Sequence, residues 1–230
     1  MKNKQQQKGF WRTWMGAGMV GMAIALGTWG IPTVAIASPG FSHPQIAQLN
    51  CNNPQTQSEM NACAARNWQS ADRELNQVYQ TLTPNLSPSR RQKLVTAQRR
   101  WIEFRDAECE FYSSLIAYGG SMQPMLRSGC METLTEQRSS ELYQYRRGEI
   151  PRAIGTNYQS SDRRLNTVYQ QLMGKLEGFL KEQLKDAELA WIAYRDALCE
   201  FERTGGGNAG YDTCMIRTTE QRTVQLENHL

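Results

Sequence analysis

A stretch of eleven residues that occurs twice constrains this 230-residue chain more than any other feature. Residues 101–111 read WIEFRDAECEF and residues 191–201 read WIAYRDALCEF, with 8 of 11 positions identical at a spacing of 90. Helix propensity does not fix one order of Trp, Arg, Asp and Cys, so the recurrence indicates a tandem duplication. Fold and function must therefore be sought in the repeated unit.

Two further segments recur in the same order. Residues 160–172 match residues 70–82 at 9 of 13 positions, and both copies place apolar residues at i, i+3, i+4 and i+7, which is typical of a helix with one buried face. Residues 135–138 (TEQR) return as 219–222 at a spacing of 84, so the second copy lacks six residues (90 − 84) in a loop. We expect an all-α fold of two tandem three-helix, disulfide-bonded units, residues 51–147 and 148–230.

A cap residue followed by proline predicts where two helices of the first copy begin. Asn53-Pro54 and Ser87-Pro88 both have this pattern, in which the proline occupies the first helical position. The first start predicts a helix, or a pair of helices, that runs to about Leu82. The second predicts the helix that carries the repeated Trp stretch.

The N-terminus has the pattern of an export signal. Four basic and no acidic residues precede an uncharged apolar run from Trp14 to Ile36, which ends in the small-x-small sequence Ala35-Ile36-Ala37. We expect residues 1–37 to be a cleaved signal peptide and residues 38–50 a linker. The alternative is a retained anchor helix, since the apolar run is long. Cleavage predicts a periplasmic or secreted protein with no membrane segment.

The charge balance argues against one class of partner. The chain has 26 Lys and Arg against 22 Asp and Glu, but four of the basic residues lie in the leader, so 22 of each sign remain. The basicity is a targeting feature, and we expect no nucleic-acid partner.

Six cysteines in an exported chain indicate disulfides. Six cysteines allow 15 connectivities, and the duplication selects among them. Two cysteines of the first copy have counterparts in the second, whereas the other two have none, and cysteines absent together were bonded together. The predicted pairs are Cys51–Cys63, Cys109–Cys130 and Cys199–Cys214.

The repeated Trp and Arg predict a polar network. Trp101 and Arg105 lie four residues apart on one helix face, as do Trp191 and Arg195, so each guanidinium can stack on a ring. The set is either a network that fixes the register of three helices or a cleft, and the network is favoured because buried polar groups need one another as partners. Its expected members are Asp72, Asn76, Trp101, Arg105, Asp106, Arg138, Asp162, Asn166, Trp191, Arg195, Asp196 and Arg222.

The sequence offers little for catalysis. Glu103, Asp106 and Glu110 share a helix face, but Glu103 is Ala193 in the second copy, so a solvated face explains them better than an acid–base site. Neither histidine, His43 nor His229, is placed for a triad or a metal site. With the cysteines in disulfides no thiolate nucleophile remains, and we expect no catalytic residue, metal or cofactor.

Two Gly-rich segments are the candidate partner surfaces. Residues 118–122 and 205–211 would each be closed by a disulfide, and a loop held at both ends loses less entropy on binding. The alternative is a plain connector. Acidic residues beside the Trp helix could add contacts, so the predicted contact set is Gly119, Gly120, Ser121, Gly205, Gly206, Gly207, Glu103 and Glu110.

The ordered motifs together resemble the LprI-like lysozyme-inhibitor domain. They comprise a cysteine pair, Asp-x-x-Leu-Asn-x-x-Tyr, Trp-Ile-x-Phe/Tyr-Arg-Asp-x-x-Cys, a Gly-rich loop, Cys and Thr-x-x-Arg, over nearly all of residues 51–230. The second copy lacks the first cysteine pair. The resemblance implies an exported helical protein that binds and inhibits a lysozyme-type cell-wall hydrolase. The alternatives are a structural or adaptor module of the cell envelope with another protein partner and, third, an envelope enzyme.

Overall fold

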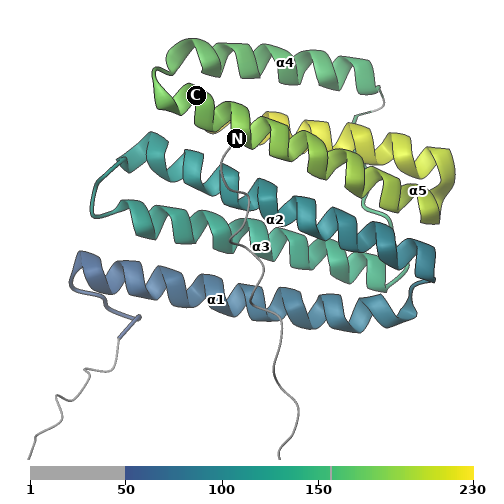
Figure 1. Ribbon diagram of the computed structural model, residues 1–230, viewed down its shortest axis with the longest axis horizontal. Helices are drawn as coiled ribbons and strands as arrows, with labels where there is room; N and C mark the ends of the chain where they lie inside the picture. The colour runs from purple at the N-terminus through teal and green to yellow at the C-terminus, as the bar shows by residue number, and fades with distance from the viewer. Residues whose placement is uncertain (1–49, 156) are drawn as a thin grey trace, which may run out of the picture. The chain divides into compact units, whose positions relative to one another are not determined.

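The computed structural model describes residues 50–155 and 157–230. These residues form helices and no strand (Figure 1), and the predicted all-α fold is confirmed. The predicted signal peptide and all but the last residue of the predicted linker lie outside them. The elements are α1 (Gln57–Leu82), the short 3-10 helix η1 (Thr83–Asn85), α2 (Pro88–Ala117), α3 (Gln123–Arg146), α4 (Tyr158–Lys175) and α5 (Phe179–Glu227).

Local capping explains where the helices of the first repeat begin. The side chain of Thr56 accepts a hydrogen bond from the Glu59 backbone, and the Glu59 carboxylate accepts from the Thr56 backbone. This capping box satisfies the free N–H groups, so α1 begins after Thr56 and the predicted start at Asn53-Pro54 was wrong by about one turn. Ser87 caps α2 ahead of Pro88, as predicted.

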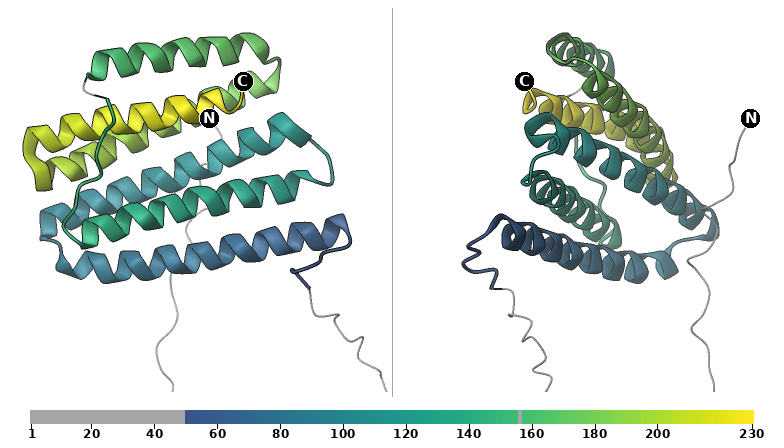
Figure 2. Two further views of the ribbon diagram at one scale, coloured as in Figure 1. Left: turned by 180° about the vertical axis from the view of Figure 1, so that it is seen from behind. Right: turned by 60° about the vertical axis from the view of Figure 1, so that its left-hand side comes forward.

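The helix α5 consists of two arms that meet at one glycine. Gly207 has φ 62° and ψ −153°, and the chain turns back there, so that residues 179–206 (the first arm) lie beside residues 208–227 (the second arm) (Figure 2). Glycine adopts this backbone without the steric penalty that a Cβ atom would bring. With the arms counted separately, each repeat supplies three helices.

The two repeats meet along α2 and the first arm of α5. In Figure 1 the order is α1, α3, α2, α5 and α4, and each helix contacts the next. The two central helices are antiparallel, because Lys93 near the start of α2 bonds Glu200, whereas Tyr118 at its end stacks on Phe179.

A pseudo-twofold axis passes between equivalent residues of the repeats. Phe104 and Tyr194, which are 90 residues apart, stack with ring centroids 5.9 Å apart and planes inclined by 6°. The hydrophobic core is continuous across this contact and contains residues of every α-helix of the described chain. Completely buried leucines such as Leu94, Leu142 and Leu184 each contribute roughly 1.5–3 kcal/mol to folding.

Three disulfides lie within the repeats. Cys51–Cys63, Cys109–Cys130 and Cys199–Cys214 are joined with Cα atoms 5.3–5.4 Å apart, the same pairs that the duplication predicted. Two of them tie the Trp-bearing helix to the helix that follows it. Closing a loop of this size stabilises the fold by about 3 kcal/mol in the chain-entropy model.

Candidate functional site

Part of the predicted polar network forms a cluster on the outer side of the first repeat. The Arg105 guanidinium lies over the rings of Trp101 and Trp68, 4.9 and 5.7 Å from their centroids. It donates two hydrogen bonds to Asp106 and lies 3.7 Å from Asp72, whose other oxygen accepts from Asn76. This cluster joins α1 to α2.

The second repeat has the corresponding cluster. Arg195 lies 5.0 Å from the Trp191 centroid and donates to Asp196 at 2.9 Å, while Asp162 accepts from Asn166. The hydroxyl of Tyr158, at the position equivalent to Trp68, lies between Arg195 and Asp162, 3.4 Å from each. Each cluster fixes the first helix of its repeat against the Trp helix.

Arg138 and Arg222, which were expected to belong to the same network, lie elsewhere. Both lie at the interface between the repeats, where each stacks on a ring of the other repeat: Arg138 over Tyr194 at 5.6 Å and Arg222 over Phe104 at 5.3 Å. Their Nε groups also bond equivalent positions, Gln98 and Glu188. Because both arginines lie at this interface, their side chains are completely buried.

One end of the interface contains the first charge cluster, which we define as Glu108, Glu188, Arg222 and His229. Arg222 pairs with Glu108 at 2.8 Å and with Glu188 at 2.6 Å, and His229 Nε2 lies 2.8 Å from Glu108. Burial disfavours the charged carboxylate, but Arg222 and His229 outweigh this and lower the pKa of Glu108 to about 2. Burial, with the negative charge of Glu108 nearby, raises the pKa of Glu188.

The other end contains the second charge cluster, which we define as Tyr145, Glu141, Glu202, Arg217 and Arg138. Glu202 is completely buried and accepts hydrogen bonds from Tyr145 and Arg217. Glu141 pairs with Arg138 at 2.8 Å and with Arg217 at 3.4 Å. Burial is the largest effect on Glu202 and raises its pKa despite Arg217.

Alignment of the two repeats did not predict most residues of the two charge clusters. Tyr145 and His229 are equivalent positions, and their rings lie edge-on to equivalent phenylalanines, Phe201 and Phe111. The carboxylates, by contrast, have no acidic counterparts: Glu108 corresponds to Leu198, and Glu202 to Tyr112. Residues that occur in one repeat only leave no signal when the copies are aligned.

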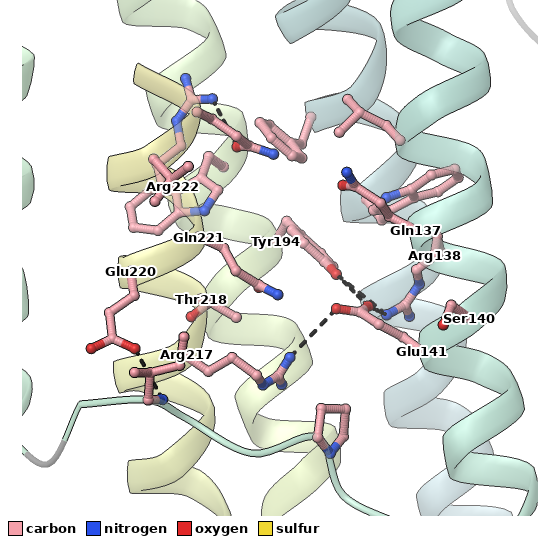
Figure 3. A pocket seen from close by; sticks show the side chains of 18 of the residues that line it. Gln137, Arg138, Ser140, Glu141, Tyr194, Arg217, Thr218, Glu220, Gln221 and Arg222 are labelled. Carbon is pink, nitrogen blue, oxygen red and sulfur yellow. Dashed lines mark hydrogen bonds and ion pairs between the residues drawn. The ribbon is translucent and has the colours of Figure 1, made fainter. Parts of the chain in front are cut away.

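A cavity of about 690 Å³ lies between α3 and the second arm of α5, with the Phe104 and Tyr194 rings in its lining. Its walls are related by the pseudo-twofold axis, and Gln137 and Gln221 point into it from opposite sides (Figure 3). The three buried arginines in its lining already face carboxylates of the charge clusters. The cavity therefore suits water or a neutral polar molecule better than an anion.

The predicted acidic flank is neutralised locally. Glu103 pairs with Arg100 at 2.7 Å, and Glu110 with Arg127 at 3.1 Å. In the described part of the chain no group of three His, Cys, Asp or Glu side chains is placed to hold a metal ion.

The segment after α2 is an exposed turn, as predicted. We call Ile116, residues 118–122 and Phe179 the first tip. Gly119 has φ 69°; its N–H donates to the Gln123 side chain, and the Gly120 N–H donates to the Ala117 carbonyl. Asn61 of α1 donates to the Ser121 carbonyl. Hydrogen bonds within the turn and one from α1 thus fix its conformation.

The segment after the first arm of α5 differs from the prediction. Residues 205–211 were expected to form a Gly-rich loop, but they continue the helix except at Gly207. A Cβ atom on Gly205 would meet the guanidinium of Arg90 at 2.6 Å, and one on Gly206 would meet Ile150 at 2.7 Å. Gly205 and Gly206 thus allow the side chains of Arg90 and Ile150 to approach the helix closely. We call residues 204–210 the second tip.

The fold, the disulfides and the internal pairing of charges define a duplicated, disulfide-bonded helical protein. The profile of the family described as "Lysozyme inhibitor LprI" matches residues 50–142 and again residues 144–226. The chain therefore belongs to the LprI family and contains two tandem copies of its domain.

Similar proteins support this assignment. An uncharacterized protein of Rhizobium meliloti (strain 1021), R02472, is 33% identical over 114 residues, which cover 44% of this chain and 81% of the relative. A crystal structure of an uncharacterized protein from Burkholderia thailandensis superposes with a TM-score of 0.56 at 17% identity, over 76% of this chain and 88% of that one. The second likeness concerns the fold alone.

None of the helices in residues 50–155 and 157–230 combines the length and the apolar character that a membrane span requires. The three disulfides fit an oxidising compartment outside the cytosol.

Proposed function

We propose that the protein is an exported, non-enzymatic binding protein, periplasmic or secreted, that inhibits a lysozyme-type cell-wall hydrolase. The observation that carries the proposal is the match of the LprI profile to two consecutive segments, which leaves little of residues 50–230 for any other domain.

The pairing of the charges supports a binding role over an enzymatic one. A catalytic acid or base must reach a substrate, whereas Glu108 and Glu202 are buried and are paired with Arg222 and Arg217. Glu103, Asp106 and Glu110 each lie beside an arginine. These carboxylates stabilise the fold.

A lysozyme assay with the oxidised protein tests the proposal. The rate at which lysozyme clears a peptidoglycan suspension should fall as the protein is added up to micromolar excess, and the protein alone should clear none. An unchanged rate at that excess would remove the inhibitor role. Capture of a non-hydrolase from an envelope extract by the immobilised protein would then favour an adaptor function.

A further inference from the structure

The two tips lie at equivalent places in the repeats but present different chemistry. At the first tip Tyr118 is 69% exposed and packs against Phe179, which is 44% exposed, with ring centroids 4.4 Å apart. The counterparts of these two rings, 90 residues away, are Asn208 and Ser89. The aromatic pair is therefore a property of one tip.

The first tip is also uncharged. Residues 111–126 contain no Asp, Glu, Lys, Arg or His, whereas the corresponding residues 201–210 contain Glu202 and Arg203. Beside the second tip, the Arg203 guanidinium lies over the ring of Tyr211, 4.0 Å from its centroid. Single apolar side chains on a surface are ordinary, but several gathered on an uncharged turn indicate a contact surface.

Ile116 and Met122 extend the apolar surface of the first tip, with 50% and 38% of their surface exposed. Exposed tyrosine and phenylalanine on a rigid turn are typical of residues that anchor an interface, because they bury a large area and lose few rotamers. The hydrogen bonds from Asn61 and within the turn, together with the Cys109–Cys130 disulfide, hold the first tip in place before it binds.

Building on the proposed function, we propose that the first tip enters the saccharide-binding cleft of the hydrolase, and that Tyr118 and Ser121 donate hydrogen bonds to its catalytic carboxylates. A glycosidase cleft binds a neutral, hydroxyl-rich chain beside a pair of carboxylic acids. An uncharged turn with ring faces and hydroxyl groups matches that cleft in charge and in donors. Tyr118 and Ser121 are both exposed, so their hydroxyl groups can donate to a partner.

The acidic flank does not fit the same cleft. Carboxylates at the contact would face the carboxylates of the enzyme, and like charges brought together in an interface are costly. Glu110 and Glu103 are instead held by Arg127 and Arg100. The uncharged turn thus makes the contact with the enzyme, and Glu103 and Glu110 lie outside that contact.

Matched substitutions at the two tips test the proposal. Tyr118→Ala should raise the dissociation constant for lysozyme at least about tenfold, as expected for truncation of an interface anchor. Ser121→Asp should weaken binding as much, because it places a charge opposite the carboxylates. Asn208→Ala and Asn208→Asp introduce the same two side chains at the second tip and should leave affinity within about twofold. Circular dichroism and thiol titration check that each variant is folded and oxidised.

Competition identifies the occupied surface of the enzyme. Loading lysozyme with a trisaccharide of N-acetylglucosamine should reduce binding of the wild-type protein in proportion to the filled clefts. Wild-type protein that binds equally well to loaded lysozyme, or a Tyr118→Ala variant that inhibits as the wild type does, would overturn the cleft contact and leave the inhibitor function standing. A wild-type protein that neither binds nor inhibits lysozyme would overturn both.

Discussion

At one end of the interface between the repeats, Glu108 of α2 lies beside Arg222 and His229; at the other end, Glu202 of α5 lies beside Arg217 and Tyr145. At both ends a ring, His229 or Tyr145, lies edge-on to a phenylalanine. The same ring also contacts the buried carboxylate. The pKa of Glu108 is nevertheless lowered, whereas that of Glu202 is raised.

The difference shows how a duplicated core diverges. Ring positions are equivalent in the two copies because packing around a pseudo-twofold axis requires similar volumes on both sides. A buried charge needs a partner of opposite charge, but it does not need a fixed position. It can occur one helical turn away in the other copy if its partner has also changed position. The two charge clusters are therefore separate solutions, and each can be broken alone.

The largest effect should come from the arginine that serves two carboxylates. Arg222→Leu leaves Glu108 and Glu188 buried without their cation, and loss of one partner of a buried pair destabilises by about 3–5 kcal/mol. Urea unfolding measures the free energy. Arg164→Leu, which removes an exposed arginine paired with Glu227, is the matched control and should cost less than about 1 kcal/mol. Equal losses in the two variants would mean that burial of the first cluster contributes little.

Acid should weaken the first charge cluster selectively. The folded pKa of Glu108, about 2, is below its ordinary value of 4.5, so its stabilising contribution is complete above pH 4.5 and is lost as the pH falls toward 2. The loss is on the order of 3 kcal/mol. Unfolding free energies measured between pH 7 and pH 2.5 should show it, and Glu108→Gln should flatten the curve in that range. A Glu108→Gln curve parallel to that of the wild type would contradict the assignment.

The second charge cluster should respond to pH in the opposite sense. Arg217→Thr introduces the residue found at the equivalent Thr133 and should cost about 2 kcal/mol at pH 7, since it leaves Glu202 with Tyr145 as donor. The raised pKa of Glu202 means that its protonated form is favoured in the fold, and the penalty grows as the pH rises through that pKa. The variant should therefore lose less stability at pH 5 than at pH 7. A loss at pH 5 that equals or exceeds the loss at pH 7 would contradict a raised pKa of Glu202.

The sequence predicted the helices and the cysteine pairs well because both follow from local rules. Caps, helical periodicity and the two aligned copies determine them without reference to tertiary contacts. The outer clusters around Arg105 and Arg195 could be predicted for the same reason, since their members recur at one spacing.

The interface between the repeats could not be predicted from the sequence, because the repeat pattern does not indicate which surfaces of the two copies meet. Arg138 and Arg222 are repeated and looked like members of the outer clusters, yet each contacts the other repeat. Glycines at 205–206 resembled a loop, but they allow Arg90 and Ile150 to approach a helix. In both places a long-range contact overrode a correct local pattern.

The smallest effect should come from the C-terminal ring of the first charge cluster. His229→Ala removes the contact with Glu108 and the edge-on contact with Phe111, and should cost about 1 kcal/mol, the net value of a hydrogen bond with part of a ring contact. His229→Tyr introduces the residue at the equivalent Tyr145, whose hydroxyl also donates to a carboxylate and whose ring lies against Phe201. If the two ends are equivalent in shape, the tyrosine variant should recover most of the loss in urea unfolding. A tyrosine variant less stable than the alanine variant would show that the pocket around Phe111 has diverged as far as the charges have.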